Sequence, residues 1–304
     1  PADTVDVIDT GTGSVIHRIN VGIDPVGIAV RPDGMEVWVT NHVSDSVSVI
    51  DSNADSPTRH HVLATIQSFD AATKSTRFDE PVGIAFANNG KAYVALSRTN
   101  QVAVIDVASR TLTSRLDITA QDPRALTVRG DRLYVIPFES NNQTQVSGCF
   151  AENIDGDLCT YDHQIHVIDA PDGGSTSAGY VSDIVRHPDV PDRDLYVFDT
   201  DTDQLVEIVD GLGTLLYGIT VDVDGNVFVA QTEGRNDANG KAGTQGHGLA
   251  ELENRAFLNQ ITHVDCGGDC GTPAFIDLEP LPPTHPAPGM ALATPFAITV
   301  SDDR

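Results

Sequence analysis

Residues 25–34 read Pro25-Val-Gly-Ile-Ala-Val-Arg-Pro-Asp-Gly34, and the pattern returns at residues 81–90 as Pro81-Val-Gly-Ile-Ala-Phe-Ala-Asn-Asn-Gly90. The alternation within each copy predicts a strand, and the closing Asp-Gly or Asn-Gly supplies the positive φ that a tight hairpin needs. Weaker copies of the first half begin at four more positions, which are Pro123, Val181, Leu216 and Pro295. The chain is therefore built from repeats.

Each repeat continues in the same order after its hairpin. An aromatic or β-branched run follows each of the first five copies, at residues 37–39, 92–94, 133–135, 195–197 and 227–229. A third run then ends in an aspartate, at Asp51, Asp106, Asp169 and Asp210, and more loosely at Asp265. With a variable fourth strand, each copy predicts a four-stranded unit. Repetition of such units predicts an all-β fold, a β-propeller of four-stranded blades.

The two ends of the chain predict how the ring closes. Residues 4–9 match a third strand, residues 14–21 a fourth, and residues 295–300 a first, so the termini share one blade. We expect six blades, with seven as the alternative. The expected bounds are 1–21 for the outer strands of the closing blade, 22–66, 67–119, 120–179, 180–214 and 215–289 for five complete blades, and 290–304 for the closing inner strand. Because the closing blade lacks a second strand, we expect the parent chain to continue past residue 304.

The first repeat also carries a recognisable signature. Its second strand reads Val37-Trp-Val-Thr-Asn41, followed by Val47-Ser-Val-Ile-Asp51, and in this it resembles the YVTN family of β-propeller repeats. The resemblance implies a propeller over nearly the whole chain. It leaves function open, because such repeats occur in surface-layer proteins, cell-surface binding proteins, lactonase-like enzymes and the propeller domains of periplasmic redox enzymes.

Composition narrows the partners and the compartment. Acidic residues number 44 against 18 basic ones, for a net charge of −26, which excludes nucleic acid as a natural partner. No stretch of about 18 apolar residues predicts membrane insertion. The cysteines form two close pairs, Cys149 with Cys159 and Cys266 with Cys270. We expect a disulfide within each pair, and hence an extracellular, cell-surface or periplasmic location, with reduced loop thiols as the alternative.

The long insertions predict where function resides. They occupy residues 67–80, 139–163, 231–260 and 267–289, all of which join a second to a third strand or a fourth to the next first strand. Such connections share one face of a propeller, so we expect this face to be the functional surface. The alternative is that the insertions only cap the channel mouth or seal a neighbouring domain. Residues 248–259 within one insertion predict an amphipathic helix.

Candidate site residues follow from this placement. The most plausible polar lining of the channel mouth consists of His42, Glu139, Gln231, Glu233, Arg235 and His247. Asp199, Asp201 and Asp203 offer three carboxylates at alternate positions, which suits a structural Ca²⁺ when backbone carbonyls join them. The alternative is a turn, because Asp203 aligns with Asp45 and Asn100 between the second and third strands.

No recognisable catalytic constellation stands out, so the sequence favours a secreted or periplasmic propeller that acts as a non-catalytic binding or scaffold module. A protein, a small molecule or a glycan would dock on the inserted-loop face, and further domains of the same polypeptide are also candidate partners. The first alternative is a propeller enzyme, either a lactonase-like hydrolase or the propeller part of a periplasmic redox enzyme, with a metal or cofactor over the central channel. The second alternative is an extracellular assembly or surface-layer component, since strong acidity suits a salty or calcium-rich exterior.

Overall fold

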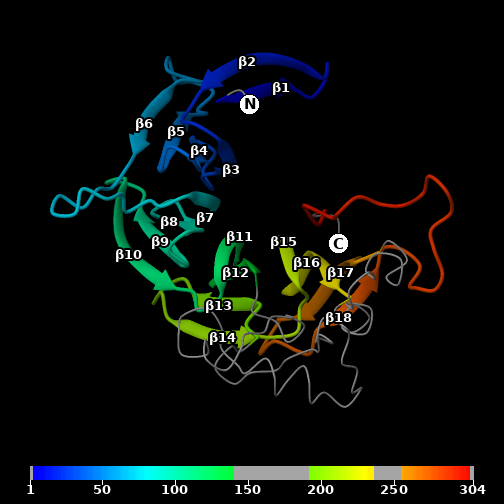
Figure 1. Cartoon of the computed structure of the whole chain (residues 1–304). Coiled ribbons are helices and arrows are strands. Elements are labelled where there is room, and N and C mark those ends of the chain that lie inside the picture. Colours follow the sequence, from blue (N-terminus) through cyan, green and yellow to red (C-terminus); the bar gives the residue numbers. More distant parts are fainter. Residues whose placement is uncertain (1–2, 140–191, 236–254, 302–304) are drawn as a thin grey trace. The chain divides into compact units, whose positions relative to one another are not determined.

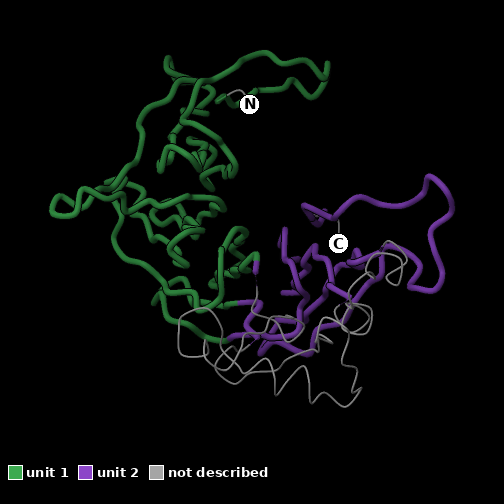
Figure 2. The backbone as a smooth tube through the Cα atoms, in the orientation of Figure 1, with its two compact units in different colours: residues 1–138, 196–207 green, residues 139–195, 208–304 purple. Residues whose placement is uncertain are grey.

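The computed structural model describes residues 3–139, 192–235 and 255–301, and within these residues all regular secondary structure is β-strand (Figure 1). No helix in the described part of the chain could cross a membrane. The chain divides into two compact units, unit 1 with residues 1–138 and 196–207, and unit 2 with residues 139–195 and 208–304 (Figure 2).

Unit 1 begins with an antiparallel hairpin and continues with two sheets of four strands in chain order. The hairpin consists of β1 (Thr4–Asp9) and β2 (Ser14–Asn20). The first sheet contains β3 (Pro25–Val30), β4 (Glu36–Asn41), β5 (Ser46–Asp51) and β6 (Val62–Ile66). The second sheet contains β7 (Pro81–Asn88), β8 (Lys91–Leu96), β9 (Gln101–Asp106) and β10 (Thr111–Asp117). These strands confirm the four-stranded repeat predicted from the sequence.

The third repeat differs from the prediction. Here β11 (Gln121–Arg129) and β12 (Arg132–Glu139) are followed in the sheet by β13 (Leu195–Asp199) and β14 (Leu205–Val209). The pairing of Arg132 with Asp199 matches that of Glu36 with Asp51 and of Lys91 with Asp106, so β13 is a third strand. It was predicted to be the second strand of a separate blade with bounds 180–214.

A run of apolar and aromatic residues that ends in aspartate, such as Leu195–Asp199, fits either a second or a third strand of a blade. Only the strand with which it pairs decides between the two positions. The boundary between residues 120–179 and 180–214 therefore does not hold for β13 and β14, which belong to the sheet of β12. The strands predicted to end at Asp169 and to begin at Val181 lie outside the described residues.

Unit 2 contains four strands that pair in chain order, β15 (Leu215–Val221), β16 (Asn226–Gly234), β17 (Phe257–Asp265) and β18 (Ala274–Asp277). The helix predicted over residues 248–259 is wrong at its end, because residues 257–259 open β17; residues 248–254 lie outside the described part. Long apolar side chains at every third or fourth position also suit a strand when both of its faces are covered.

Neighbouring first strands approach closely at a glycine. A Cβ on Gly27 of β3 would collide with the carbonyl oxygen of Val82, and one on Gly83 of β7 would lie 2.5 Å from the carbonyl oxygen of Arg124. In unit 2 the Cβ position of Gly218 lies 3.2 Å from the carbonyl oxygen of Phe296. The same repeat position thus meets the next copy in all three cases, as the sequence alignment requires.

Residues 295–300 therefore lie beside β15, where the repeat places a further first strand. The prediction that they form a strand is wrong, since the structure assigns them no strand pairing. A first strand needs a second strand along its edge to satisfy its backbone hydrogen bonds, and residues 295–300 have none among the described residues.

The core of unit 1 lies between its sheets. The buried indole of Trp38 on β4 meets Phe86 on β7 edge-on, at 5.2 Å between ring centroids. Valines 47 and 49 pack on the same side with Ile84, and a second cluster joins Val5 and Ile19 of the hairpin to Val39. This packing holds the loops that connect the strands on a rigid base.

Candidate functional site

The described residues of the predicted polar lining lie near the carboxyl ends of second strands, at the end of the sheets where a second strand leads to a third and a fourth leads to the next first strand. We call this the loop end. In unit 1 it carries the insertion of residues 67–80, which folds back on itself through a bridge between Phe69 and Thr76 and an ion pair of Arg77 with Asp70 at 2.9 Å. The ring of Phe69 remains 62% exposed. The insertion is therefore an ordered hairpin that presents an aromatic side chain.

A repeated hydrogen bond fixes the loop end from one copy to the next. Before four of the third strands, the preceding residue accepts a backbone N–H from the start of the next first strand or from the segment that leads into it. The four bonds run from Asp24 to Asp3 (3.2 Å), from Glu80 to Asp45 (3.1 Å), from Asp122 to Asn100 (2.9 Å) and from Leu212 to Asp194 (2.5 Å). The asparagine or aspartate just before the third strand therefore links one copy of the repeat to the next. This position can be recognised in the sequence once the strands have been assigned.

His42 lies at this end of the first sheet, directly after β4. Its backbone N–H donates to the carbonyl oxygen of Asp24 at 2.8 Å, while its Nδ1 is buried without a hydrogen-bond partner. Burial raises the pKa of Asp79 in the neighbouring insertion; the guanidinium of Arg98 opposes this rise, and the carboxylates of Asp45 and Glu80 add to it. A buried imidazole nitrogen and a partly buried carboxyl give the loop end of unit 1 hydrogen-bonding capacity for a polar group.

Gln231 does not line a channel mouth, because β16 runs on to Gly234 and buries it completely. A directional chain of amides explains its position. Asp277 can only accept, so Gln260 donates Nε2 to it at 2.7 Å and accepts Nε2 of Gln231 at 2.9 Å through its own oxygen. The Oε1 of Gln231 then turns toward Gly213, where any Cβ would collide with it. Gln231 is therefore a core residue.

The other predicted lining residues of unit 2 are spread over the strand ends. Glu233 accepts a hydrogen bond from the Thr214 hydroxyl at 3.2 Å. Arg235 donates to the carbonyl oxygen of Arg255 at 3.1 Å, so its guanidinium ties the start of the third strand to the end of the second. Glu139 is the exposed last residue of β12, and His247 lies outside the described residues.

A polar cluster that the sequence did not suggest holds the segment after β18. Glu279 accepts the side-chain amide of Asn259 at 3.1 Å and the backbone N–H of Leu292 at 2.8 Å. Arg255 donates to the carbonyl oxygens of Pro280 at 2.6 Å and Thr284 at 3.2 Å. The insertion after β18 is thus fastened to β17, through partners too distant in sequence to be paired beforehand.

The structure does not bring Asp199, Asp201 and Asp203 together as a ligand set. Asp199 accepts from Thr202 at 2.8 Å and from Arg132 at 2.9 Å. Asp203 accepts the Tyr93 hydroxyl at 2.5 Å and forms an ion pair with Lys91 at 3.0 Å. Asp203 has φ 59° and lies in the turn between a third and a fourth strand, so its alignment with Asp45 and Asn100 is wrong. Within the described ranges no three His, Cys, Asp or Glu side chains gather as metal ligands.

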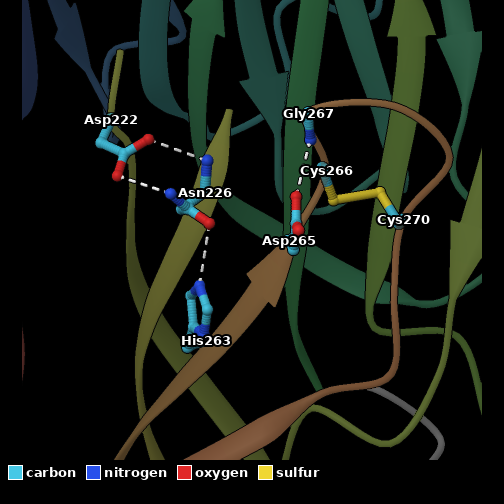
Figure 3. The surroundings of a disulfide bond; sticks show 7 residues. All are labelled: Asp222, Asn226, His263, Asp265, Cys266, Gly267 and Cys270. Carbon is cyan, nitrogen blue, oxygen red and sulfur yellow. Dashed lines mark hydrogen bonds between the residues drawn. A yellow bond between two sulfur atoms is a disulfide. The ribbon is translucent and has the colours of Figure 1, made fainter. Parts of the chain in front are cut away.

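The cysteine prediction is confirmed for one pair. Cys266 and Cys270 form a disulfide in the turn between β17 and β18 (Figure 3). Cys149 and Cys159 lie outside the described residues.

Comparison with known proteins supports a β-propeller. The chain is 33% identical over 143 residues to the seven-bladed beta-propeller protein Rv1057 of Mycobacterium tuberculosis, an alignment that covers 45% of this chain and 32% of the relative. Among solved structures, the hydrazine synthase of Kuenenia stuttgartiensis matches with a TM-score of 0.59 at 20% identity, over 92% of this chain and 61% of that one. The chain thus spans about a third of the curated relative's length. No protein-family model matches the chain.

These similarities and the four-stranded sheets agree on the fold. The described residues are all-β and the fold is of the β-propeller class, while the number of blades and the YVTN repeat type stay predictions.

Proposed function

We propose that the chain is an exported, YVTN-like β-propeller that acts as a non-catalytic binding or scaffold module, with a protein partner docking on its loop end. The observation that carries the proposal is the placement of the insertions. Residues 67–80 join a fourth strand to the next first strand, and residues 278–294 lead from the fourth strand β18 to the segment beside β15. Both insertions present exposed apolar side chains: Phe69, Leu281, Met290 and Leu292. Connections on a rigid scaffold are where binding residues concentrate.

The opposite end of the sheets supports this choice by contrast. There the turns between first and second strands are short and close on their own side chains. Arg31 pairs with Asp33 at 2.6 Å, Asn88 accepts the backbone N–H of Gly90 at 2.7 Å, and Asp222 binds Asn226 through backbone and side chain at 2.9 and 2.8 Å. Turns that satisfy themselves in this way leave few groups for a ligand.

The rigidity of the base supports a docking role. The hydrogen bond repeated before four of the third strands joins consecutive copies at the loop end, and one of these bonds holds Glu80, the last residue of the insertion of residues 67–80. A surface whose supports do not move pays less ordering entropy when a partner binds.

The proposed location outside the cytoplasm rests on the Cys266–Cys270 disulfide, which persists in an oxidising compartment. The net charge of −26 favours a partner with a basic or neutral surface.

A site-specific photocrosslinker tests the docking surface. We would introduce benzoylphenylalanine at Phe69 on the loop end, and at Met35, an exposed residue in a short turn at the opposite end, as the matched control. We expect the Phe69 probe, and not the Met35 probe, to capture a discrete protein from the extracellular or periplasmic fraction of the cells that make the chain. Equal capture at both positions, or capture at Met35 alone, would refute docking on the loop end.

A further inference from the structure

The turns between third and fourth strands share a common closure in three of the copies. Each third strand ends in an aspartate whose Oδ1 accepts both the backbone N–H and the hydroxyl of the third residue after it. Asp9 binds Thr12 at 2.7 and 2.9 Å, Asp106 binds Ser109 at 2.7 and 2.6 Å, and Asp199 binds Thr202 at 2.8 Å through both groups. The fourth strand follows within a few residues: β2 starts at Ser14, β10 at Thr111 and β14 at Leu205.

The turn of unit 2 lacks this closure. Asp265 ends β17 in the expected place, but the third residue after it is Gly268, which has no hydroxyl. The carboxylate of Asp265 accepts the N–H of Gly267 at 3.1 Å (Figure 3). The fourth strand, β18, does not begin until Ala274. The Cys266–Cys270 disulfide spans this longer turn. A covalent bond thus stands where the other copies use a hydroxyl.

The two cysteines are held differently. Cys266 is buried, and its N–H donates to the carbonyl oxygen of Gly225 at 3.1 Å, which fixes it to the turn between β15 and β16. Cys270 is only half-buried and leads toward β18. All four residues of β18 are exposed, with Phe275 at 50% and Ile276 at 47%. The disulfide therefore joins a weakly packed outer strand to a fixed point of the sheet.

We infer that the Cys266–Cys270 disulfide is a redox-controlled clasp that keeps β18 paired with β17, and that a dithiol reductant releases this strand locally. The inference does not depend on the proposed docking function. In the reaction a reductant thiolate attacks Sγ of the more accessible Cys270 and expels the Cys266 thiolate, which takes up a proton. The second reductant thiol then attacks the mixed disulfide and releases Cys270 as a thiol. Two electrons pass to the protein, and the reductant leaves as its own disulfide.

The size of the effect follows from the length of the closed loop. The disulfide joins residues 4 apart, so it closes a short loop and removes only a modest amount of chain entropy from the open state. The loop-closure relation predicts that loss of the bond raises the local opening equilibrium constant on the order of 30-fold. Residues 260–263 of β17 pair with β18 on one edge. On its other edge β17 pairs with β16 along its whole length, so the loss of β18 would leave β17 held in the sheet. Opening should therefore stop at β18.

Hydrogen exchange measured by mass spectrometry on the full chain tests the clasp. We expect the double substitution Cys266→Ser and Cys270→Ser to raise exchange in residues 271–278 by about 30-fold and to leave β15 and β16 unchanged. The matched control is Cys149→Ser with Cys159→Ser, which keeps the clasp. A dithiol reductant should reproduce the first result in the control protein, and reoxidation should reverse it.

Two outcomes would overturn the inference. One is exchange in residues 274–277 that changes by less than about threefold when the bond is lost, because β18 would then be held without it. The other is a common rise through β15, β16 and β17, because the bond would then support the whole sheet instead of one strand.

Discussion

Exchanging the charges of Lys91 and Asp203 should reveal whether residues 195–209 complete the sheet of β12. Lys91 opens β8, and its Nζ lies 3.0 Å from Asp203 and 2.7 Å from the carbonyl oxygen of Thr200. The side chains are only 25% and 22% exposed, and the buried Tyr93 hydroxyl also donates to Asp203. The preceding interface has the same arrangement with the opposite polarity, because Glu36 opens β4 and accepts from Arg110 at 3.0 Å.

The magnitudes follow from these contacts. Lys91→Glu removes a charged hydrogen bond and sets two carboxylates side by side, and Asp203→Arg deprives Tyr93 and Lys91 of their acceptor. Each should lower the free energy of unfolding by about 2.5 kcal/mol. The double exchange recreates the polarity of Glu36 and Arg110, so we expect a loss of about 2 kcal/mol instead of the additive 5, a coupling of about 3 kcal/mol.

Urea unfolding followed by the fluorescence of Trp38 measures this cycle, since the chain has a single tryptophan and its side chain is buried. The control pairs Lys91→Glu with Asp117→Arg, because Asp117 lies at the loop end of β10 and should not couple to Lys91. A coupling below about 0.5 kcal/mol in the test pair would refute the ion pair between Lys91 and Asp203.

Three further substitutions test the packing and the electrostatics. Gly83→Ala should cost about 3 kcal/mol in urea unfolding because its Cβ would press on the carbonyl oxygen of Arg124, whereas Gly268→Ala, with open space around it, should stay within about 0.5 kcal/mol. Gly213→Ala should likewise destabilise unit 2 in thermal unfolding, and an unchanged melting temperature would contradict the amide chain that ends at Gln231. Asp79→Asn should stabilise the fold at pH 7 and have no effect near pH 3. The folded-state pKa of Asp79 is raised, so the folded protein binds more protons than the unfolded chain just above the carboxyl's normal pKa, and stability falls as pH rises through that window. Equal effects at both pH values would contradict this reasoning.

The sequence predicted the strands wherever a local pattern decides them. Both copies that begin with Pro-Val-Gly-Ile form first strands, and the following runs form β4, β5, β8 and β9 in the expected register. The pattern failed at Leu195–Asp199, because alternation and a final aspartate do not say which neighbour a strand pairs with. That choice depends on β12, which precedes it by more than fifty residues.

The candidate site was harder to predict for a related reason. Gln231 has no local feature that distinguishes a lining residue from a buried one, and its burial depends on Gln260 and Asp277 in two later strands. The role of Glu279 likewise depends on partners at Asn259 and Leu292. Polar networks between strands follow from tertiary pairing, which a single sequence does not contain.

Equivalent positions of the repeats keep their geometry although the residues that occupy them differ. This helps to distinguish residues that support the fold from residues available for function. The aspartate that ends each third strand is committed to its own turn. Hydrogen bonds from Thr12 and Ser109 lower the pKa of Asp9 and Asp106, as would be expected of carboxylates that remain charged acceptors in the fold. At the equivalent turn, unit 2 has a disulfide. The ion pairs between neighbouring sheets have opposite polarity, because Glu36 accepts from Arg110 in one and Lys91 donates to Asp203 in the next.

Much of the excess of acidic over basic residues therefore supports the fold, because these carboxylates accept hydrogen bonds from donors of the chain itself. Groups that follow no repeat are better candidates for function. The exposed Phe69 and the half-buried Asp79 both belong to the insertion of residues 67–80, which has no counterpart between the hairpin of β1 and β2 and the first sheet. The fold does not need Phe69 or Asp79, because the equivalent connection elsewhere lacks this insertion. A partner that recognises this chain and not other propellers would therefore have to contact residues such as these, which do not belong to the repeat.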